Sequence, residues 1–201
     1  SAGGDLNWMK RMAAYTHEQN LQDSRALAEM LRVLNFMSRP TIARVQGVAF
    51  GGAVGLVSCC DMAVASATAT FSLSEVKIGL MPATISPYVV AAIGARSARR
   101  YFTTAERFSA EQAQAMGLVS ELVADDSELD AAVDALVSAI LGNSPAAVAA
   151  SKQLIFDVAN QPVEAELIEM TCQRIADIRA SAEGQEGLTA FLEKRKPSWI
   201  Q

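Results

Sequence analysis

A glycine-rich stretch, residues 47–56, has the composition of a backbone anion site. It follows a strand-like run and leads into an apolar run that ends at Asp61. Without side chains, the amides of such a turn can approach a ligand closely, and the dipole of a following helix stabilises negative charge there. A P-loop and a dinucleotide fingerprint are excluded, because no Gly-Lys-Ser/Thr ends the stretch and the glycine spacing does not fit. Two interpretations stay open: an oxyanion hole, or a turn whose glycines only permit tight packing.

Glu75 is the candidate acid–base residue. It stands between the apolar run 70–73 and the largely apolar turn 76–82. A carboxylate in that place is either a solvated loop residue or a partly buried acid with a raised pKa, and the sequence leaves both open. His17, the only histidine, lies in a polar stretch and is predicted to be a surface residue rather than a catalytic one.

Composition limits the class of protein. The chain has 201 residues, of which 51% are hydrophobic and 19% charged, enough for one good core and a small second lobe. The net charge of −5 gives no electrostatic footprint for nucleic acid or an anionic membrane, and no apolar run has the length of a membrane span. Three cysteines, two of them adjacent, suit a reducing compartment, and no cysteine and histidine spacing resembles a metal site. We therefore expect a cytoplasmic protein without a metal.

Periodicity and cap signals predict the elements that must hold these residues. An apolar stripe favours a helix from Asp23 or Ser24 to about Phe36, after a mobile loop or broken helix over 6–19. Short strands are expected at 41–46, 62–65, 70–73 and 118–123. Further helices are expected at 53–60, 87–93, 97–105, 109–117, 125–141, from Ser144 to before Pro162, 163–180 and 186–195. The two-sided apolar content of the late helices indicates either that they pack on a partner subunit as well as on their own core, or that they are fully buried.

Four segments, in this order and spacing, resemble the crotonase superfamily of enoyl-CoA hydratases and isomerases. They are the A-G-x-D-like turn 1–6, the G-x-x-x-G-G-like segment 46–53 with Cys60-Asp61, the F-x-x-x-E…G-x-x-P-like segment 71–82, and the A-F-x-E-K-R-like segment 190–197. Within the superfamily, residues 58–61, 85–87 and 181–187 most resemble bacterial methylglutaconyl-CoA hydratases of leucine breakdown.

The resemblance implies an α/β fold, a spiral of ββα units followed by a helical trimerisation region. The core would be residues 1–140 and the trimerisation region 141–201, in a homotrimer or a dimer of trimers. Ser1–Asp5 reads like the middle of a domain, so the first strands of the family are expected to be missing.

The resemblance also implies the site residues. The amides of Gly4 and Gly52 would form an oxyanion hole for the thioester carbonyl, and removing one such donor typically costs about 3 kcal/mol. Glu75 would exchange a proton at C2 of the substrate. The residues expected to contact CoA, which is part of the substrate and not a separate cofactor, are Ala2, Asp5, Leu6, Phe191 and Lys194. Lys194 would pair with a CoA phosphate or remain a solvated terminal lysine.

One departure from the family pattern concerns Gly55, which stands where typical hydratases have a first glutamate that activates water. Three interpretations follow. Glu75 alone serves as acid and base in hydration; or Glu75 shuttles a proton between C2 and C4 in an isomerase; or the chain is a CoA-thioester-binding paralogue with little turnover.

The expected pocket wall, residues 83–86, replaces a glycine-rich run of the family. Thr84 and Ser86 could bond a polar acyl group or water, although local capping is the favoured role for Ser86. Lys77 and Arg44 are candidates, by proximity in sequence only, for a distal acyl carboxylate.

Overall fold

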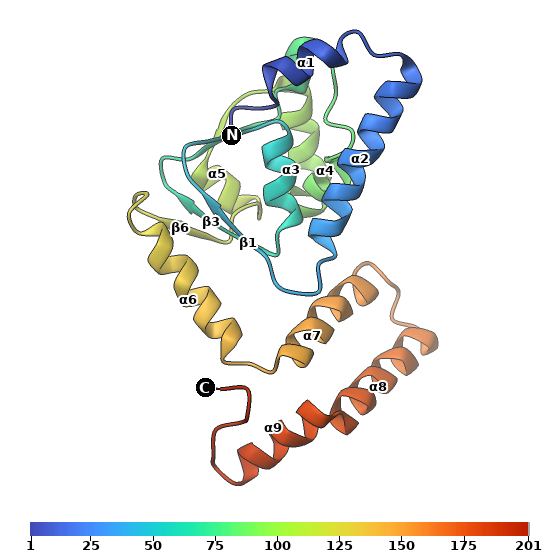
Figure 1. Cartoon of the computed structure of the whole chain (residues 1–201), viewed down its shortest axis with the longest axis vertical. Coiled ribbons are helices and arrows are strands. Elements are labelled where there is room, and N and C mark those ends of the chain that lie inside the picture. Colours follow the sequence, from blue (N-terminus) through green and yellow to red (C-terminus); the bar gives the residue numbers. More distant parts are fainter. Residues whose placement is uncertain (201) are drawn as a thin grey trace. The chain divides into compact units, whose positions relative to one another are not determined.

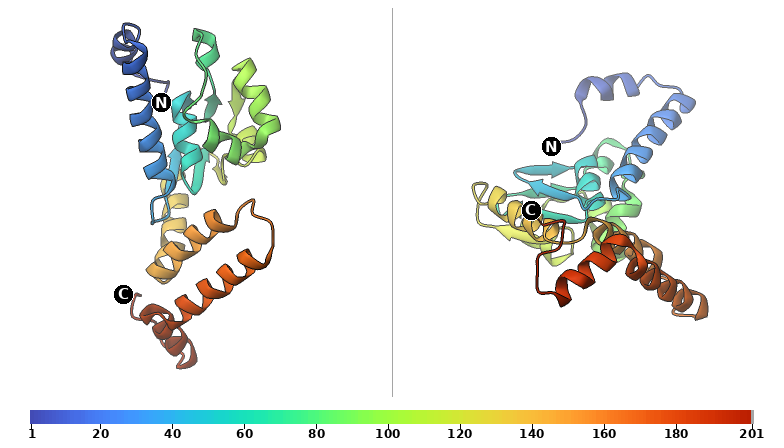
Figure 2. Two further views of the ribbon diagram at one scale, coloured as in Figure 1. Left: turned by 90° about the vertical axis from the view of Figure 1, so that its right-hand side faces the viewer. Right: turned by 60° about the horizontal axis from the view of Figure 1, so that its bottom comes forward.

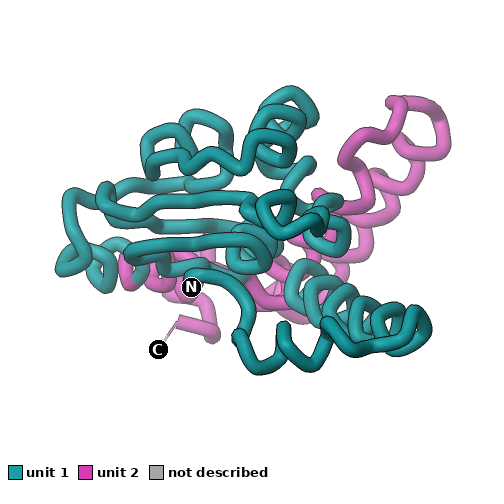
Figure 3. Tube along the Cα trace, turned by 90° about the horizontal axis from the view of Figure 1, so that it is seen from above, with its two compact units in different colours: residues 1–37, 41–133 teal, residues 38–40, 134–201 magenta. Residues whose placement is uncertain are grey.

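The computed structural model describes residues 1–200, which fall into two compact units (Figure 3). Unit 1 comprises Ser1–Met37 and Thr41–Val133, and unit 2 comprises Ser38–Pro40 and the residues from Asp134 onward. The boundary falls inside helix α6 (Leu129–Leu141), and each unit is described by itself.

Unit 1 contains two three-stranded sheets. The first is fully parallel in the order β1-β3-β6, and in the second, of order β2-β4-β5, β2 and β4 are parallel and β5 is antiparallel to β4. The strands are β1 (Ile42–Val45), β2 (Val48–Phe50), β3 (Met62–Ser66), β4 (Thr70–Ser72), β5 (Phe108–Ser109) and β6 (Glu121–Val123).

Two ββα units follow one another along the chain. The first is β1, β2 and α3 (Gly52–Cys59), and the second is β3, β4 and α4 (Ser86–Thr104), which is preceded by the 3₁₀ helix η1 (Glu75–Ile78). Because β1 pairs with β3 and β2 with β4, equivalent strands of the two units lie side by side. Helix α3 packs against both α2 and α4 (Figure 1).

The N-terminal helices correct the sequence prediction. Residues 6–19 were expected to be a loop or broken helix, but α1 (Leu6–Met12) is helical and α2 (His17–Asn35) starts well before Asp23. The reason is a capping box at Thr16, whose hydroxyl accepts from the Gln19 amide while the Gln19 side chain accepts from the Thr16 amide. His17, the first residue of α2, is exposed as expected.

Most other predicted elements are confirmed, with shifts at their ends. The break at Gly94 is present inside α4, where this residue has a φ of 73°. The capping box at Ser109 and the left-handed Gly117 bound α5 (Ala110–Ala115) as predicted. Strands β2 and β5 were missed, and β6 begins three residues later than expected.

Unit 2 is helical. After α6 come α7 (Pro145–Val158), α8 (Ala165–Ala180) and α9 (Ala182–Leu192), and α9 contacts both α7 and α8 (Figure 2). Helix α9 begins four residues before the expected Glu186, because the Ser181 hydroxyl accepts from the Gly184 amide and caps it there. Helix α8 has no buried residue, and apolar side chains such as Ile168 and Leu192 are exposed on α8 and α9.

In residues 1–200 no single helix combines the length and apolar composition needed to cross a membrane, and only the bent pair α6 and α7 does so jointly.

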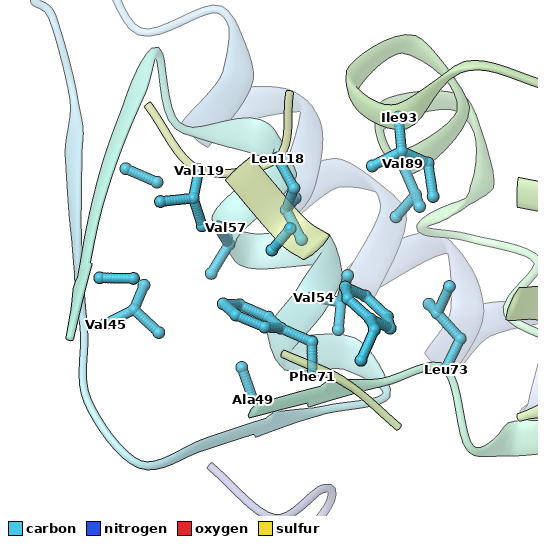
Figure 4. Packing of buried hydrophobic residues seen from close by; sticks show 14 of the residues in the cluster. Val45, Ala49, Val54, Val57, Phe71, Leu73, Val89, Ile93, Leu118 and Val119 are labelled. Carbon is cyan, nitrogen blue, oxygen red and sulfur yellow. The ribbon is translucent and has the colours of Figure 1, made fainter. Parts of the chain in front are cut away.

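The core of unit 1 lies where strands and helices meet around Phe71 on β4 (Figure 4). The Phe71 ring stacks on the Phe108 ring of β5, with 5.5 Å between the ring centroids. The Tyr101 ring of α4 lies against the same Phe108 ring, with 4.4 Å between the centroids. Phe71 is fully buried, so this strand, which leads directly to Glu75, is fixed from inside the unit.

Replacing Phe71 by alanine should therefore destabilise unit 1 by about 3–5 kcal/mol, through lost burial and the cavity left behind. Chemical denaturation followed by circular dichroism measures this loss. Phe191→Ala is the matched control, because that ring is 81% exposed and should change stability by less than about 0.5 kcal/mol. Equal losses in the two variants would contradict the proposed core.

Candidate active site

Three chain segments end at the same edge of unit 1. The Ser1 ammonium donates to the Val48 carbonyl at 2.6 Å and the Ser1 carbonyl accepts from the Phe50 amide at 2.9 Å, which is the pattern of parallel strands. β2 and β4 are also parallel, with Phe50 opposite Ser72. The residues that follow these three segments are therefore brought to one edge, where α/β proteins commonly bind ligands. They are Gly4, Gly52 and Glu75.

The turn into α3 depends on Gly51. Its φ of 57° and ψ of −124° are those of the first central residue of a type II′ turn, a conformation that glycine adopts readily. The Gly51 amide donates to the Ser72 carbonyl at 2.8 Å and so extends the β2–β4 pairing.

Gly52 opens α3, and the first amides of a helix have no partner within it. Among residues 1–200, neither the Gly52 nor the Gly4 amide donates a hydrogen bond, and both residues are exposed. Two main-chain donors therefore remain available to an anionic oxygen at this edge, with the helix dipole of α3 adding partial positive charge.

The Glu75 carboxyl lies against the Gly51 backbone. Its Oε1 is 3.3 Å from the position that a Cβ on Gly51 would occupy, so the missing side chain leaves room for the acid. Its Oε2 is buried and has no hydrogen-bond partner among residues 1–200. This resolves the alternative left open by the sequence, because Glu75 is a partly buried acid and not a solvated loop residue.

Burial raises the pKa of Glu75 above its usual value of 4.5, and its own backbone amide opposes that rise. No charged side chain among residues 1–200 contributes to the shift. A partly desolvated carboxyl of this kind can accept and return a proton nearer neutral pH than an exposed glutamate can.

The N-terminal residues predicted to contact CoA are at the surface. Ala2 and Leu6 are exposed, while the Asp5 carboxylate caps α1 by accepting from the amides of Asn7 and Trp8 at 2.6 and 3.0 Å. These two hydrogen bonds, both accepted by Oδ1, lower the pKa of Asp5 and hold its side chain at the start of α1.

The other two predicted CoA contacts belong to unit 2. Phe191, near the end of α9, is exposed, and Lys194 follows the helix in the left-handed conformation with a φ of 54°. Arg195, next in the chain, pairs with Glu186 at 2.7 Å and with Glu193 at 2.8 Å. These pairs fix the end of the segment that carries Phe191 and Lys194.

Two of the polar candidates for the acyl group, Ser86 and Arg44, have partners within unit 1. The Ser86 hydroxyl donates to the Ala83 carbonyl at 2.8 Å, and the expected capping role is wrong, because α4 begins at Ser86 itself and has no side-chain cap. Arg44 pairs with Asp130 at 2.6 Å, whereas Lys77 lies exposed on η1. No cluster of three or more potential metal-ligating side chains is present in residues 1–200.

A separate groove of about 880 Å³ lies between α4 and α5 and is lined by Arg96, Arg99 and Arg100 among others. None of Gly4, Gly52 and Glu75 lines it. The groove between α4 and α5 is therefore separate from the candidate active site.

The sequence matches the enoyl-CoA hydratase/isomerase family over residues 1–201. The chain belongs to this enzyme family. It is 33% identical to 2,3-dehydroadipyl-CoA hydratase of Escherichia coli, over 99% of this chain and 76% of the relative, and 31% identical to crotonyl-CoA hydratase of Syntrophomonas wolfei, over 99% and 75%.

Solved structures confirm the predicted fold. An enoyl-CoA hydratase from Shewanella pealeana is similar with a TM-score of 0.95 at 48% identity, covering 99% of this chain and 74% of that one. A crotonase-type protein from Legionella pneumophila gives 0.92 at 50% identity, covering 99% and 76%. The crotonase fold with its helical C-terminal region is therefore established for this chain.

Glu75→Gln should raise the melting temperature at about pH 8, because the folded pKa of Glu75 is raised and folding favours the protonated form. The stability that protonation gives is complete below the unfolded pKa and is lost as pH rises through the folded pKa. Glutamine imitates the protonated acid and does not titrate, so the difference from wild type should vanish near pH 4.

Thermal unfolding at several pH values measures this difference. Glu106→Gln is the matched control with the opposite sign, since Glu106 pairs with Arg100 at 2.6 Å and its pKa is lowered. A Glu75→Gln variant that melts below wild type at pH 8 would show that the folded state does not disfavour the charged carboxylate.

Proposed function

We propose that this protein is an enoyl-CoA hydratase that adds water to a short branched acyl-CoA, with methylglutaconyl-CoA as its preferred substrate. The observation that carries the proposal is the partly buried carboxyl of Glu75, whose Oε2 has no hydrogen-bond partner among residues 1–200, at the edge where the Gly4 and Gly52 amides also lie without a partner in those residues. One titratable group and two fixed donors are the minimum that hydration through an enolate requires.

In the proposed reaction the thioester oxygen accepts hydrogen bonds from the Gly4 and Gly52 amides. Glu75 takes a proton from water as the water oxygen bonds to C3, and the electrons of the C2–C3 double bond move onto the thioester as an enolate. Glu75 then returns the proton to C2, so that one water is added in total. Donors held by the backbone stabilise the enolate without reorganising, which is why such groups are effective.

The substrate assignment is supported by residues 58–61, 85–87 and 181–187, which resemble methylglutaconyl-CoA hydratases. Among relatives, the E. coli protein is named for a dehydroadipyl thioester. An Aspergillus fumigatus protein, 37% identical over 81% of this chain and 60% of its own length, is named for mevalonyl-CoA. Both named acyl groups carry a polar function beyond the thioester. Lys77, exposed on η1, is then the better-placed cation for a distal carboxylate, because Arg44 already pairs with Asp130.

The remaining features of the proposal concern CoA and assembly. The backbone at Ala2, Asp5 and Leu6 would contact the CoA adenine, while Phe191 and Lys194 would contact CoA of a neighbouring subunit. The exposed apolar side chains of α8 and α9 support a trimer or dimer of trimers in which residues 141–201 mediate assembly. We place the enzyme in the cytoplasm, where its free thiols would remain reduced.

An isomerase is the second candidate. Moving a double bond between C2 and C4 needs only one base, and Gly55 leaves α3 without a carboxylate at the position where hydratases of the family usually have one. A paralogue that binds CoA thioesters with little turnover is the third.

Glu75→Gln should lower kcat by about 10²–10⁴-fold while leaving the affinity for a CoA thioester nearly unchanged, since the base is lost and the shape is kept. Loss of the enoyl absorbance band measures turnover, and calorimetric titration with a saturated acyl-CoA measures binding. The Glu106→Gln variant controls for removing a carboxylate elsewhere in unit 1. In the wild type, kcat/KM should fall on the acid side with a pKa above 4.5, the usual value for glutamate. Unchanged hydration in Glu75→Gln would remove this residue from the mechanism.

Methylglutaconyl-CoA should be hydrated with a higher kcat/KM than crotonyl-CoA, because the proposed pocket accepts a branched acyl group with a distal charge. Parallel initial-rate assays with these two thioesters and a 3-enoyl-CoA test this preference. Activity on the 3-enoyl-CoA only would favour the isomerase, and affinity without any absorbance change would favour the binding paralogue.

A further inference from the structure

Two glycines at the start of α3 leave space that side chains from other parts of unit 1 fill. Gly51 is the N-cap residue, whose φ of 57° and ψ of −124° are not helical, and Gly55 lies four residues later, inside the helix. The Glu75 carboxyl fills the space beside Gly51, and Ile85 fills the space beside Gly55. A hydrocarbon side chain therefore occupies the space beside Gly55, four residues after the glycine that lies against the acid.

The contact at Gly55 leaves no room for any side chain. A Cβ on Gly55 would lie 2.1 Å from Cγ2 and 2.6 Å from Cβ of Ile85. Both distances are far below van der Waals contact, and the second atom is attached directly to the Ile85 backbone. A change of rotamer can move Cγ2 away but leaves Cβ in place, so Ile85 cannot yield without a backbone shift.

Ile85 is held firmly. It is 2% exposed and belongs to the buried cluster that includes Val54 of α3 and Val89 of α4. It immediately precedes α4, and its carbonyl accepts from the Val89 amide at 3.1 Å in the first turn of that helix. The restriction on position 55 is thus set by the start of α4, thirty residues further along the chain.

We propose that Ile85 is the positioning residue that keeps this a one-carboxylate site, because it fills the only space a side chain at position 55 could use. This inference rests on the proposed function for its chemical consequence. Because Ile85 leaves no room for a side chain at position 55, that position supplies no second base to orient water, and both proton transfers fall to Glu75. Ile85 itself touches no reacting atom.

The steric part is tested without any assay of activity. Gly55→Ala should lower the melting temperature by at least about 5 °C in the wild-type background. In the Ile85→Val background, which keeps Cβ and a γ-methyl group, Gly55→Ala should lower the melting temperature by the same amount. In the Ile85→Gly background it should lower the melting temperature little or not at all. Gly142→Ala is the control, because a Cβ there meets nothing closer than 3.5 Å. If Gly55→Ala is recovered folded only in the Ile85→Gly background, the inference is equally supported; a wild-type melting temperature for Gly55→Ala alone would overturn it.

The chemical part is tested by pH profiles. Ile85→Gly should admit water beside Glu75 and shift the acid limb of kcat/KM to lower pH, whereas Ile85→Val should leave it in place. Gly55→Glu in the Ile85→Gly background should add a second ionisation and raise the ratio of crotonyl-CoA hydration to 3-enoyl-CoA isomerisation, with Gly55→Gln in that background as the neutral control. Identical profiles in wild type and Ile85→Gly would show that Ile85 has only a packing role.

Different results would overturn the proposed function and the inference about Ile85. If Glu75→Gln retains turnover, the proposed function fails while the thermal coupling between positions 55 and 85 can still hold. If that coupling is missing while Glu75→Gln is inactive, the inference about Ile85 fails and the single-base mechanism stands.

Discussion

The contact between the Glu75 carboxyl and the Gly51 backbone is the constraint on which the candidate site depends. It places an ionisable group in a partly dry space with one oxygen unpaired. An unsatisfied buried acceptor costs about 1–3 kcal/mol, which is a noticeable share of the 5–15 kcal/mol by which a typical protein is stable. The fold tolerates that cost because the strand before Glu75 is held by parallel pairing with β2 and by the buried rings of Phe71 and Phe108.

Absent side chains shape this site as much as present ones. Gly51 permits a turn conformation that side chains disfavour and leaves room for an acid, and Gly55 leaves room for Ile85. The two positions differ in what they exclude. At Gly51 the nearest atom is the flexible end of Glu75, so the backbone conformation is the stronger restriction, whereas at Gly55 the restriction is steric.

Much of this arrangement was predictable from the sequence. The apolar runs gave β1, β3 and β4, and the motif around residues 71–82 singled out Glu75. Strand β2 was missed because Val48–Phe50 lies inside the glycine-rich stretch, where three apolar residues are too few to show alternation. The start of α2 was missed because its cap at Thr16 lies in a polar stretch, several residues before the apolar stripe begins.

Two properties of the site could not be predicted from local sequence. The burial of Glu75 depends on β2 and β4 being paired, and the occupation of the space at Gly55 depends on a residue thirty positions away. Both are consequences of tertiary contacts between segments that carry no signal of their association. The family motif marks which glycines and which acid matter, whereas the pairing of each glycine with a particular side chain emerges only in the folded unit.

Different groups of the site stabilise the anionic oxygen and transfer the proton. Main-chain amides at Gly4 and Gly52 cannot titrate, so their ability to stabilise an anionic oxygen is constant over the pH range in which the protein is folded. The acid–base task falls on Glu75, whose pKa is raised by burial and by no charged neighbour among residues 1–200. Because no second charge tunes this carboxyl, its proton affinity is governed by how much water reaches it. Apolar packing near Glu75 is therefore part of the chemistry of the site as well as of the stability of unit 1.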